Sequence, residues 1–303
     1  MRVATSTMSS SLITQALRNQ GDYNSALNQQ SSGLKDPSLN GLGGLAGTTV
    51  SLASDLKRSD HLVTQATTAQ SEVEVAYGKV SKIADLVKTA QVAIAAAISG
   101  DVSNATGLPT SAEGWLTDIA NMLNTQVGGT YVFAGAGGVG APVDLSAYNP
   151  PLLPAVPTPL NTDYYKGSTT TTQIMVDADA KGGIEYGVTA GNDVFANTLK
   201  AIHDLTKSPP DLATLQSASK ALSAATTELG KTLETLSAQS DRLTSLVDTQ
   251  TEFQLFAESA LESLTKVDVA EATAKASERS VVLKASFSAL SSMMSLSLLD
   301  YLR

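Results

Sequence analysis

The chain has 303 residues, of which 42% are hydrophobic, 5% aromatic and 16% charged, and its net charge is −9. This acidic balance, with no run of Lys and Arg, argues against nucleic acid as a partner because phosphate binding needs clustered cations. The absence of cysteine excludes disulfides, thiolate metal sites and cysteine nucleophiles.

The first 30 or so residues predict a helix that ends at a marked break. Apolar residues recur near helical spacing and form a seam along this helix, at Met8, Leu12, Ala16, Tyr23, Leu27 and Leu34. Two polar residues, Asn19 and Gln30, occupy further positions of the same seam. Gly33 is suited to cap the helix end, and Pro37 disfavours helix at the residue before it. The glycine-rich segment 40–44 extends the break.

A second helix is expected from about residue 45 to 99. One apolar stripe follows it through Val63, Ala66, Val73, Val80, Ile83, Val87, Ala90 and Ile94. Glycines at 100 and 107 and a proline at 109 indicate a loop. Ser111 is predicted to be the N-cap of a shorter helix that follows.

The middle of the chain, residues 131–191, differs from both ends and predicts a β-rich lobe. Strand-like pieces occur at 130–134, 164–165, 169–176 and 184–189. Five of the ten prolines fall between Pro150 and Pro159, and seven of the 14 aromatic residues lie between Tyr131 and Phe195. A small lobe needs such large side chains for its core.

Helix is expected again from about Asn192, with an interruption at 208–211 and Asp211 as the cap of the restart. The last segment, 212–302, has a heptad-type seam: Leu229, Leu233, Leu236, Leu243, Val247, Gln250, Gln254, Ala257, Leu261 and Leu264. A further stripe runs through Leu283, Phe287, Leu290, Met294, Leu298 and Tyr301. Unbroken, this helix would span on the order of 130 Å, so we expect either a rod or a break, the break being placed near 267–270.

These elements predict a mainly α fold with an inserted β-rich lobe, in which the N- and C-terminal segments form a long antiparallel helical bundle or coiled coil. The predicted division is an assembly helix and hinge at 1–44, a helical rod domain at 45–130 plus 192–270, the outer lobe at 131–191, and a C-terminal assembly helix at 271–303.

Two motifs resemble ligand sites but lack the required context. The glycine run 135–140 satisfies G-x-G-x-x-G, yet a proline-rich segment follows where a dinucleotide fold needs a helix, so a turning connector is the better interpretation. Residues 177–182 begin like a calcium loop, but Lys181 and Val188 stand where oxygen ligands belong. A solvated turn between two strands fits better.

The remaining candidates are also weak. His61 and His203, the only histidines, lie outside any metal or catalytic spacing and are expected on helix surfaces. The segment Pro151–Pro157 could bind an SH3-like module, although a stiff surface strap fits it better. Paired acids, metal ligands and an activated nucleophile are all missing, so we predict no enzyme, no catalytic residues, no cofactor and no metal.

Membrane insertion and cleaved secretion are not expected either. The nearest candidate for a membrane span, Ala285–Leu299, is uncharged but rich in serine and shorter than a membrane span. The N-terminus lacks the apolar core of a cleaved signal peptide.

Five segments stand out together: the opening 1–8, the break at 31–37, the motif 123–135 where a helix enters a glycine turn and an aromatic strand, the return to helix at 191–195, and the ending 295–302. In this order they resemble the family of the third hook-associated protein of the bacterial flagellum, the hook–filament junction subunit in the flagellin superfamily. Together these motifs cover both ends of the chain and both boundaries of the lobe.

The resemblance implies a structural junction subunit that assembles as a ring or helical tube. Its implied partners are further copies of itself, the adjacent hook-associated protein, flagellin, the flagellar type III export machinery and an export chaperone that binds the C-terminus. It implies an extracellular place at the hook–filament junction, reached without a cleaved signal. We predict as assembly contacts Met8, Leu12, Leu27, Leu290, Met294, Leu298 and Tyr301.

Three alternatives remain open at this stage. The chain could be a flagellin, including a minor one, although the motif 130–135 and the C-terminal ending favour the junction subunit. It could be a secreted adhesin that binds through its lobe. A nucleotide enzyme that uses the glycine run is the third.

Overall fold

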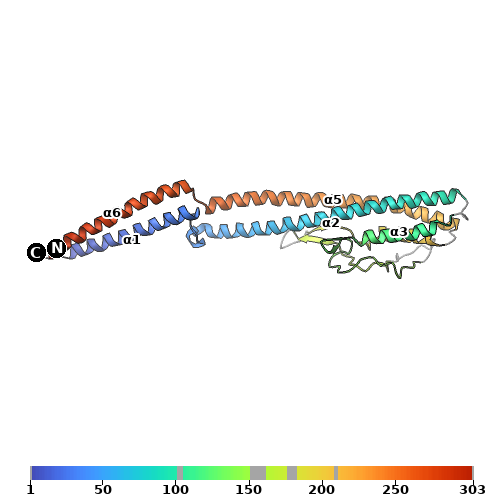
Figure 1. Cartoon of the computed structure of the whole chain (residues 1–303), viewed down its shortest axis with the longest axis horizontal. Helices are drawn as coiled ribbons and strands as arrows, with labels where there is room; N and C mark the ends of the chain where they lie inside the picture. Colours follow the sequence, from blue (N-terminus) through green and yellow to red (C-terminus); the bar gives the residue numbers. More distant parts are fainter. Residues whose placement is uncertain (1, 101–104, 151–161, 176–182, 208–210, 302–303) are drawn as a thin grey trace. The chain divides into compact units, whose positions relative to one another are not determined.

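The computed structural model describes residues 2–100, 105–150, 162–175, 183–207 and 211–301, and within these ranges it leaves the side chains of residues 2–9, 39–40 and 293–301 undescribed. The helices in chain order (Figure 1) are α1 (Arg2–Ser32), η1 (Leu39–Leu45), α2 (Ala46–Ser99), α3 (Leu108–Leu123), α4 (Asp193–His203), η3 (Asp204–Thr206), α5 (Leu212–Thr265) and α6 (Val269–Tyr301).

The chain divides into two compact units. Unit 1 comprises residues 1–60 and 252–303, and unit 2 comprises residues 61–251. The predicted fold class, mainly α with an inserted strand-containing lobe, is confirmed.

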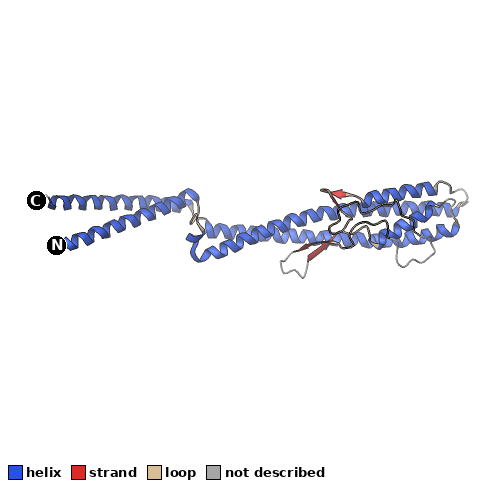
Figure 2. Ribbon diagram, turned by 90° about the horizontal axis from the view of Figure 1, so that it is seen from below, coloured by secondary structure: helices blue, strands red, loops and turns tan. Residues whose placement is uncertain are grey.

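The lobe contains two small antiparallel sheets (Figure 2). Strands β1 (Gln126–Val127) and β2 (Thr130–Tyr131) form a hairpin whose two turn residues, Gly128 and Gly129, both have positive φ, as a type I′ turn requires. Strands β3 (Thr172–Met175) and β4 (Gly183–Tyr186) pair with Thr172 opposite Tyr186. The rest of the described lobe consists mainly of turns and loops.

The core of unit 2 follows the predicted helical stripes. On α2 the stripe is buried from Ala66 to Ile94, and only Val63 at its start is half-buried. On α5 the fully buried side chains include Leu215, Leu222, Leu229 and Leu243. Side-chain hydrogen bonds from Gln70 to Thr244 and from Gln91 to Thr226 join the two helices, which lie side by side.

Aromatic side chains fill the core of the lobe, as expected. The rings of Phe133 and Phe195 meet edge to face with centroids 6.1 Å apart, and neither residue is exposed. The buried Tyr164 hydroxyl donates to the Ala190 carbonyl at 2.8 Å. These contacts join the loop after β2 to α4.

The glycine run 135–140 serves close packing and turning, as the sequence indicated. Gly135 has φ of +74°, and a Cβ there would lie 2.4 Å from the carbonyl oxygen of Ser168. The Tyr165 hydroxyl donates to the neighbouring Ala134 carbonyl at 3.0 Å. The calcium-like segment 177–182 and the proline segment 151–157 lie outside the described residues.

Of the two predicted N-cap residues, Asp211 is confirmed and Ser111 is wrong. Asp211 caps α5, since its carboxylate accepts from the Thr214 amide at 2.6 Å. Ser111 is not the N-cap of α3, because that helix already begins at Leu108. Proline is accepted in the first turn of a helix, because the N–H that it lacks would have no partner within the helix. Pro109 therefore does not prevent the helix from starting one turn earlier than expected.

Both predicted helix breaks are confirmed. Gly33, with φ of +69°, ends α1, and its amide donates to the Gln29 carbonyl at 2.9 Å. The second break lies between Thr265 and Val269, where the Asp268 carboxylate accepts from the Ala270 amide at 2.8 Å and caps α6. In the part of the chain that the structure describes, no helix combines the length and hydropathy of a membrane span.

Candidate assembly interface

The α1–α6 pair of unit 1 is the candidate assembly interface. The two helices lie side by side (Figures 1 and 2) along a seam of small side chains, and its buried apolar members are Ala16, Ala26, Ala272 and Ala276. Polar contacts complete this seam. The amide of the buried Asn19 donates to the Ser286 hydroxyl at 2.6 Å, and Arg279 pairs with Asp22 at 3.2 Å.

An alanine seam removes little apolar surface from water, because each alanine contributes only one methyl group. Several larger apolar side chains of the pair instead face away from it, with Leu17 63% and Val281 66% exposed. The other exposed members are Ile13, Leu27, Val269, Val282 and Phe287. Covering these seven partly exposed side chains in an assembly would contribute on the order of 10 kcal/mol per subunit. The pair is therefore better suited to packing against other chains than to standing alone.

The predicted assembly contacts fall into three groups. Leu12 and Leu290 are half-buried beside the seam, while Leu27 is 43% exposed because Ala26 takes the seam position next to it. The side chains of the remaining four predicted residues lie outside the described part: Met8, Met294, Leu298 and Tyr301. The role of all seven as contacts between subunits stays a prediction.

A short backbone ladder joins the two helix breaks of unit 1. Leu34 and Lys266 form an antiparallel bridge in which the Lys35 amide donates to Thr265 at 2.7 Å and the Val267 amide donates to Gly33 at 2.9 Å. The break after α1 and the break before α6 are thus fixed to each other, although they are far apart in the sequence.

The sequence analysis missed a buried polar cluster in unit 2. Lys200 and Asp204 lie one helical turn apart with nitrogen and oxygen 3.5 Å apart, and their side chains are only 5% and 0% exposed. The ring of Tyr148 stacks edge to face on His203 and on Tyr164, with centroids 5.6 and 5.4 Å away. Burial, assisted by the charge of Asp204, raises the pKa of Tyr148. The spacing i, i+4 of Lys200 and Asp204 was the available signal, but spacing alone does not indicate burial.

This cluster corrects the expectation for one histidine. His61 is exposed on α2 as predicted, but the side chain of His203 is only 19% exposed. It lies against Tyr148, and its Nδ1 is 4.0 Å from the Asp204 carboxylate. The surface expectation failed for His203 because the loop that carries Tyr148 covers the end of α4.

Two side chains fasten the β3–β4 hairpin to the helices of unit 2. The Gln239 side chain accepts from the Gly187 amide at 2.9 Å and donates to the Gly187 carbonyl at 3.4 Å. On the other helix, the half-buried Glu72 is hydrogen bonded to the Tyr186 hydroxyl. Burial raises the pKa of Glu72, and burial together with the Glu72 carboxylate raises the pKa of Tyr186 to about 12.

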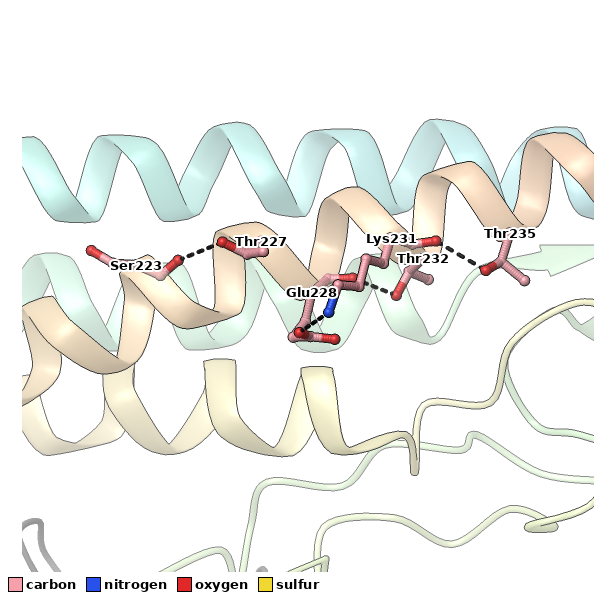
Figure 3. A network of polar contacts seen from close by, with 6 residues as sticks. All are labelled: Ser223, Thr227, Glu228, Lys231, Thr232 and Thr235. Carbon is pink, nitrogen blue, oxygen red and sulfur yellow. Dashed lines mark hydrogen bonds and ion pairs between the residues drawn. The ribbon is translucent and has the colours of Figure 1, made fainter.

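A polar groove of about 680 Å³ lies between these hairpin residues, the start of α4 and one face of α5. Figure 3 shows the α5 side, where Glu228 pairs with Lys231 at 2.7 Å. The hydroxyls of Thr232 and Thr235 donate to carbonyls four residues earlier in their own helix. These groups are satisfied locally, so the groove wall is a hydrated helix surface. Among the described residues, no three His, Asp or Glu side chains gather so as to hold a metal ion.

Comparisons with known proteins agree with this architecture. Residues 3–137 match the family model of the bacterial flagellin N-terminal helical region. A solved protein of Vibrio parahaemolyticus, provisionally assigned as a flagellar hook-associated protein, is 12% identical with a TM-score of 0.56 over 73% of this chain and 97% of its own. FlgL of Bacillus cereus is 12% identical with a TM-score of 0.44, covering 72% of this chain and 99% of its own.

No curated protein sequence matches the chain significantly. The Vibrio structure, at 12% identity, shows a shared fold. The match over residues 3–137, which make up less than half of the chain, shows that this part is similar to the flagellin N-terminal helical region.

Proposed function

We propose that this chain is a structural subunit of the bacterial flagellum, and specifically a junction subunit that links the hook side to the flagellin filament. The observation that carries the proposal is the α1–α6 pair, whose seam is made of alanines while Leu17, Val281 and Phe287 are turned outward. A pair built this way gains most of its apolar burial from neighbouring chains. The flagellin-type match of residues 3–137 supports the flagellum as the place where those neighbours are found.

The proposed partners follow from that role. Copies of the chain pack head to tail, since a heterologous contact generates rings or helical tubes whereas a two-fold contact stops at a dimer. The hook-side hook-associated protein and flagellin contact the two ends of such a ring. The export machinery delivers the subunit without a cleaved signal, and a chaperone covers its C-terminal helix before assembly.

The experiment is a deletion at the end of α6. Removing residues 294–303 is expected to leave a soluble, folded unit 2 but to abolish incorporation at the junction, because the predicted assembly contacts Met294, Leu298 and Tyr301 are lost. Incorporation is measured by immunolabelling of isolated flagella, and motility on soft agar is the second readout. A matched deletion of the lobe segment 151–161, which spares both assembly helices, is the control. A motile strain with normal filaments after the C-terminal deletion would contradict the proposal.

A second candidate, the filament subunit flagellin, is favoured by one observation: the matching family model is that of flagellin itself. Copy number separates the two roles. Labelling along the whole filament, with thousands of copies, would identify a flagellin, whereas a single band at the distal edge of the hook would identify the junction subunit.

A further inference from the structure

The last turns of α5, which belong to unit 1, carry an apolar patch that lies outside the buried seam of the helix. Leu255 is 65% and Phe256 67% exposed, although Ala257 beside them is completely buried. With 3.6 residues per turn, Leu255 and Phe256 point away from the buried side of the helix, which holds the seam positions Gln254, Ala257 and Leu261. We call Leu255, Phe256 and the flanking exposed acids Glu252 and Glu258 the α5 face.

The first turns of α2, in the same unit, carry a face of opposite charge. Val50 is 51% exposed, and Ser54, Lys57 and Arg58 are exposed on the same side of the helix. Arg58 forms an ion pair with Asp55 at 2.6 Å, so Lys57 is the cation on this side that is better placed to contact a partner. We call Val50, Ser54, Lys57 and Arg58 the α2 face.

The two faces complement each other. One presents two large apolar side chains flanked by carboxylates, and the other presents an apolar side chain near the Lys57 ammonium group, since the Arg58 guanidinium is paired with Asp55. Exposed clustered apolar groups favour an interface, and charges of opposite sign select the partner and its register. Every copy of the chain carries both faces. A second copy is therefore a partner that always offers the matching surface.

We propose that the α5 face of one copy packs against the α2 face of the next copy. This contact rests on the proposed function as an assembling flagellar subunit, and it names a lateral surface outside the α1–α6 pair. Since the two faces differ, the contact is heterologous and leaves one free α5 face and one free α2 face at the ends of any row. It therefore propagates around a ring or along a helical tube.

The absence of cysteine from the chain makes disulfide trapping the direct test. Two differently tagged variants, Phe256→Cys and Lys57→Cys, are expressed together in a flagellated strain in place of the native copy, and isolated flagella are oxidised. The expected product is a mixed dimer that carries both tags. The control replaces Lys57→Cys with Val92→Cys, an exposed position on the same helix about 50 Å further along.

The outcomes separate failure of this contact from failure of the proposed function. If both variants are present in isolated flagella but no mixed dimer forms, the contact is wrong and the function stands. A dimer of Phe256→Cys with itself, or equal trapping with Val92→Cys, would also overturn the contact. If the chain is missing from isolated flagella altogether, the proposed function fails and the contact fails with it.

Substitutions give a second, independent readout. Phe256→Ser is expected to lower incorporation into flagella by about tenfold or more, because buried aromatic anchors dominate interface energies. Lys57→Glu should lower incorporation several-fold, and adding Glu252→Lys should restore it by exchanging the two charges. Thermal unfolding of the soluble subunits should be unchanged, because all three side chains are exposed. Loss of incorporation without rescue by the charge exchange would contradict the pairing.

Discussion

The α1–α6 pair and the core of unit 2 are both made of packed helices, but they bury different residues. Unit 2 encloses large side chains such as Ile83, Leu222 and Phe195, none of which is exposed. The α1–α6 seam encloses alanines and an asparagine, and leaves Leu17 and Phe287 outside. The contrast indicates that unit 2 has a closed core of its own, whereas the seam of the terminal helices buries little apolar surface. Under the proposed function, further chains would cover the exposed side chains of these helices.

The largest expected effect on stability comes from comparing substitutions of two phenylalanines, one in each region. Phe195→Ala should lower the free energy of unfolding by about 3–5 kcal/mol, because it opens a cavity in a closed core. Phe287→Ala in the dissociated subunit should change it by less than about 0.5 kcal/mol. Urea denaturation followed by the fluorescence of the single tryptophan, Trp115, measures the first, and circular dichroism measures both. Equal losses would mean that the terminal pair has a closed core of its own.

A second test compares a buried and an exposed ion pair in unit 2. Asp204→Ala should cost about 3 kcal/mol, because it leaves the buried Lys200 without its nearest carboxylate. Glu228→Ala, which breaks the exposed pair with Lys231, should change the stability far less, because water and salt screen the attraction between exposed charges. Thermal and urea denaturation measure both values. The double variant Lys200→Met, Asp204→Leu should recover most of the loss, and a persistent loss would point to other contacts of the two residues.

A smaller effect on stability is expected at Gln239, which fastens the β3–β4 hairpin to α5. Gln239→Ala removes two hydrogen bonds to the Gly187 backbone and should cost about 1–2 kcal/mol, mostly as local opening of the β3–β4 hairpin. Hydrogen exchange of the Gly187 amide should accelerate, whereas exchange in the core of α2 should not. The exposed Gln216→Ala on the same helix is the control. Unchanged exchange at Gly187 would show that the hairpin is held by other contacts.

The smallest effect is a dependence of stability on pH through Glu72. Burial raises its pKa in the folded state, so in the window just above the ordinary carboxyl range the folded protein binds more protons than the unfolded chain. The contribution of Glu72 to stability is therefore most favourable at acidic pH and declines as the pH rises through the folded-state pKa. Glu72→Gln should flatten this decline in unfolding titrations between about pH 4 and 7, while the exposed Glu74→Gln should not. A steeper decline in Glu72→Gln would reverse the sign and contradict the assignment.

Sequence reasoning predicted the fold well where neighbouring residues decide the structure. The breaks at Gly33 and near residue 267, the cap at Asp211 and the apolar stripe of α2 all follow from turn chemistry and helical periodicity. It was less accurate where a proline allowed an earlier helix start, as at Pro109. The predicted contacts at the two termini remain predictions because they concern other chains.

By itself, the sequence determined the long helices, their breaks and the position of the lobe, since these depend on residues within a few positions of one another. Only the tertiary structure decided that Lys200, Asp204 and His203 are covered and that Leu255 and Phe256 are not. Burial depends on which distant segments meet. A lysine in a closed core and a lysine on a helix surface have the same local pattern, and the difference lies in the loop or helix that packs over them.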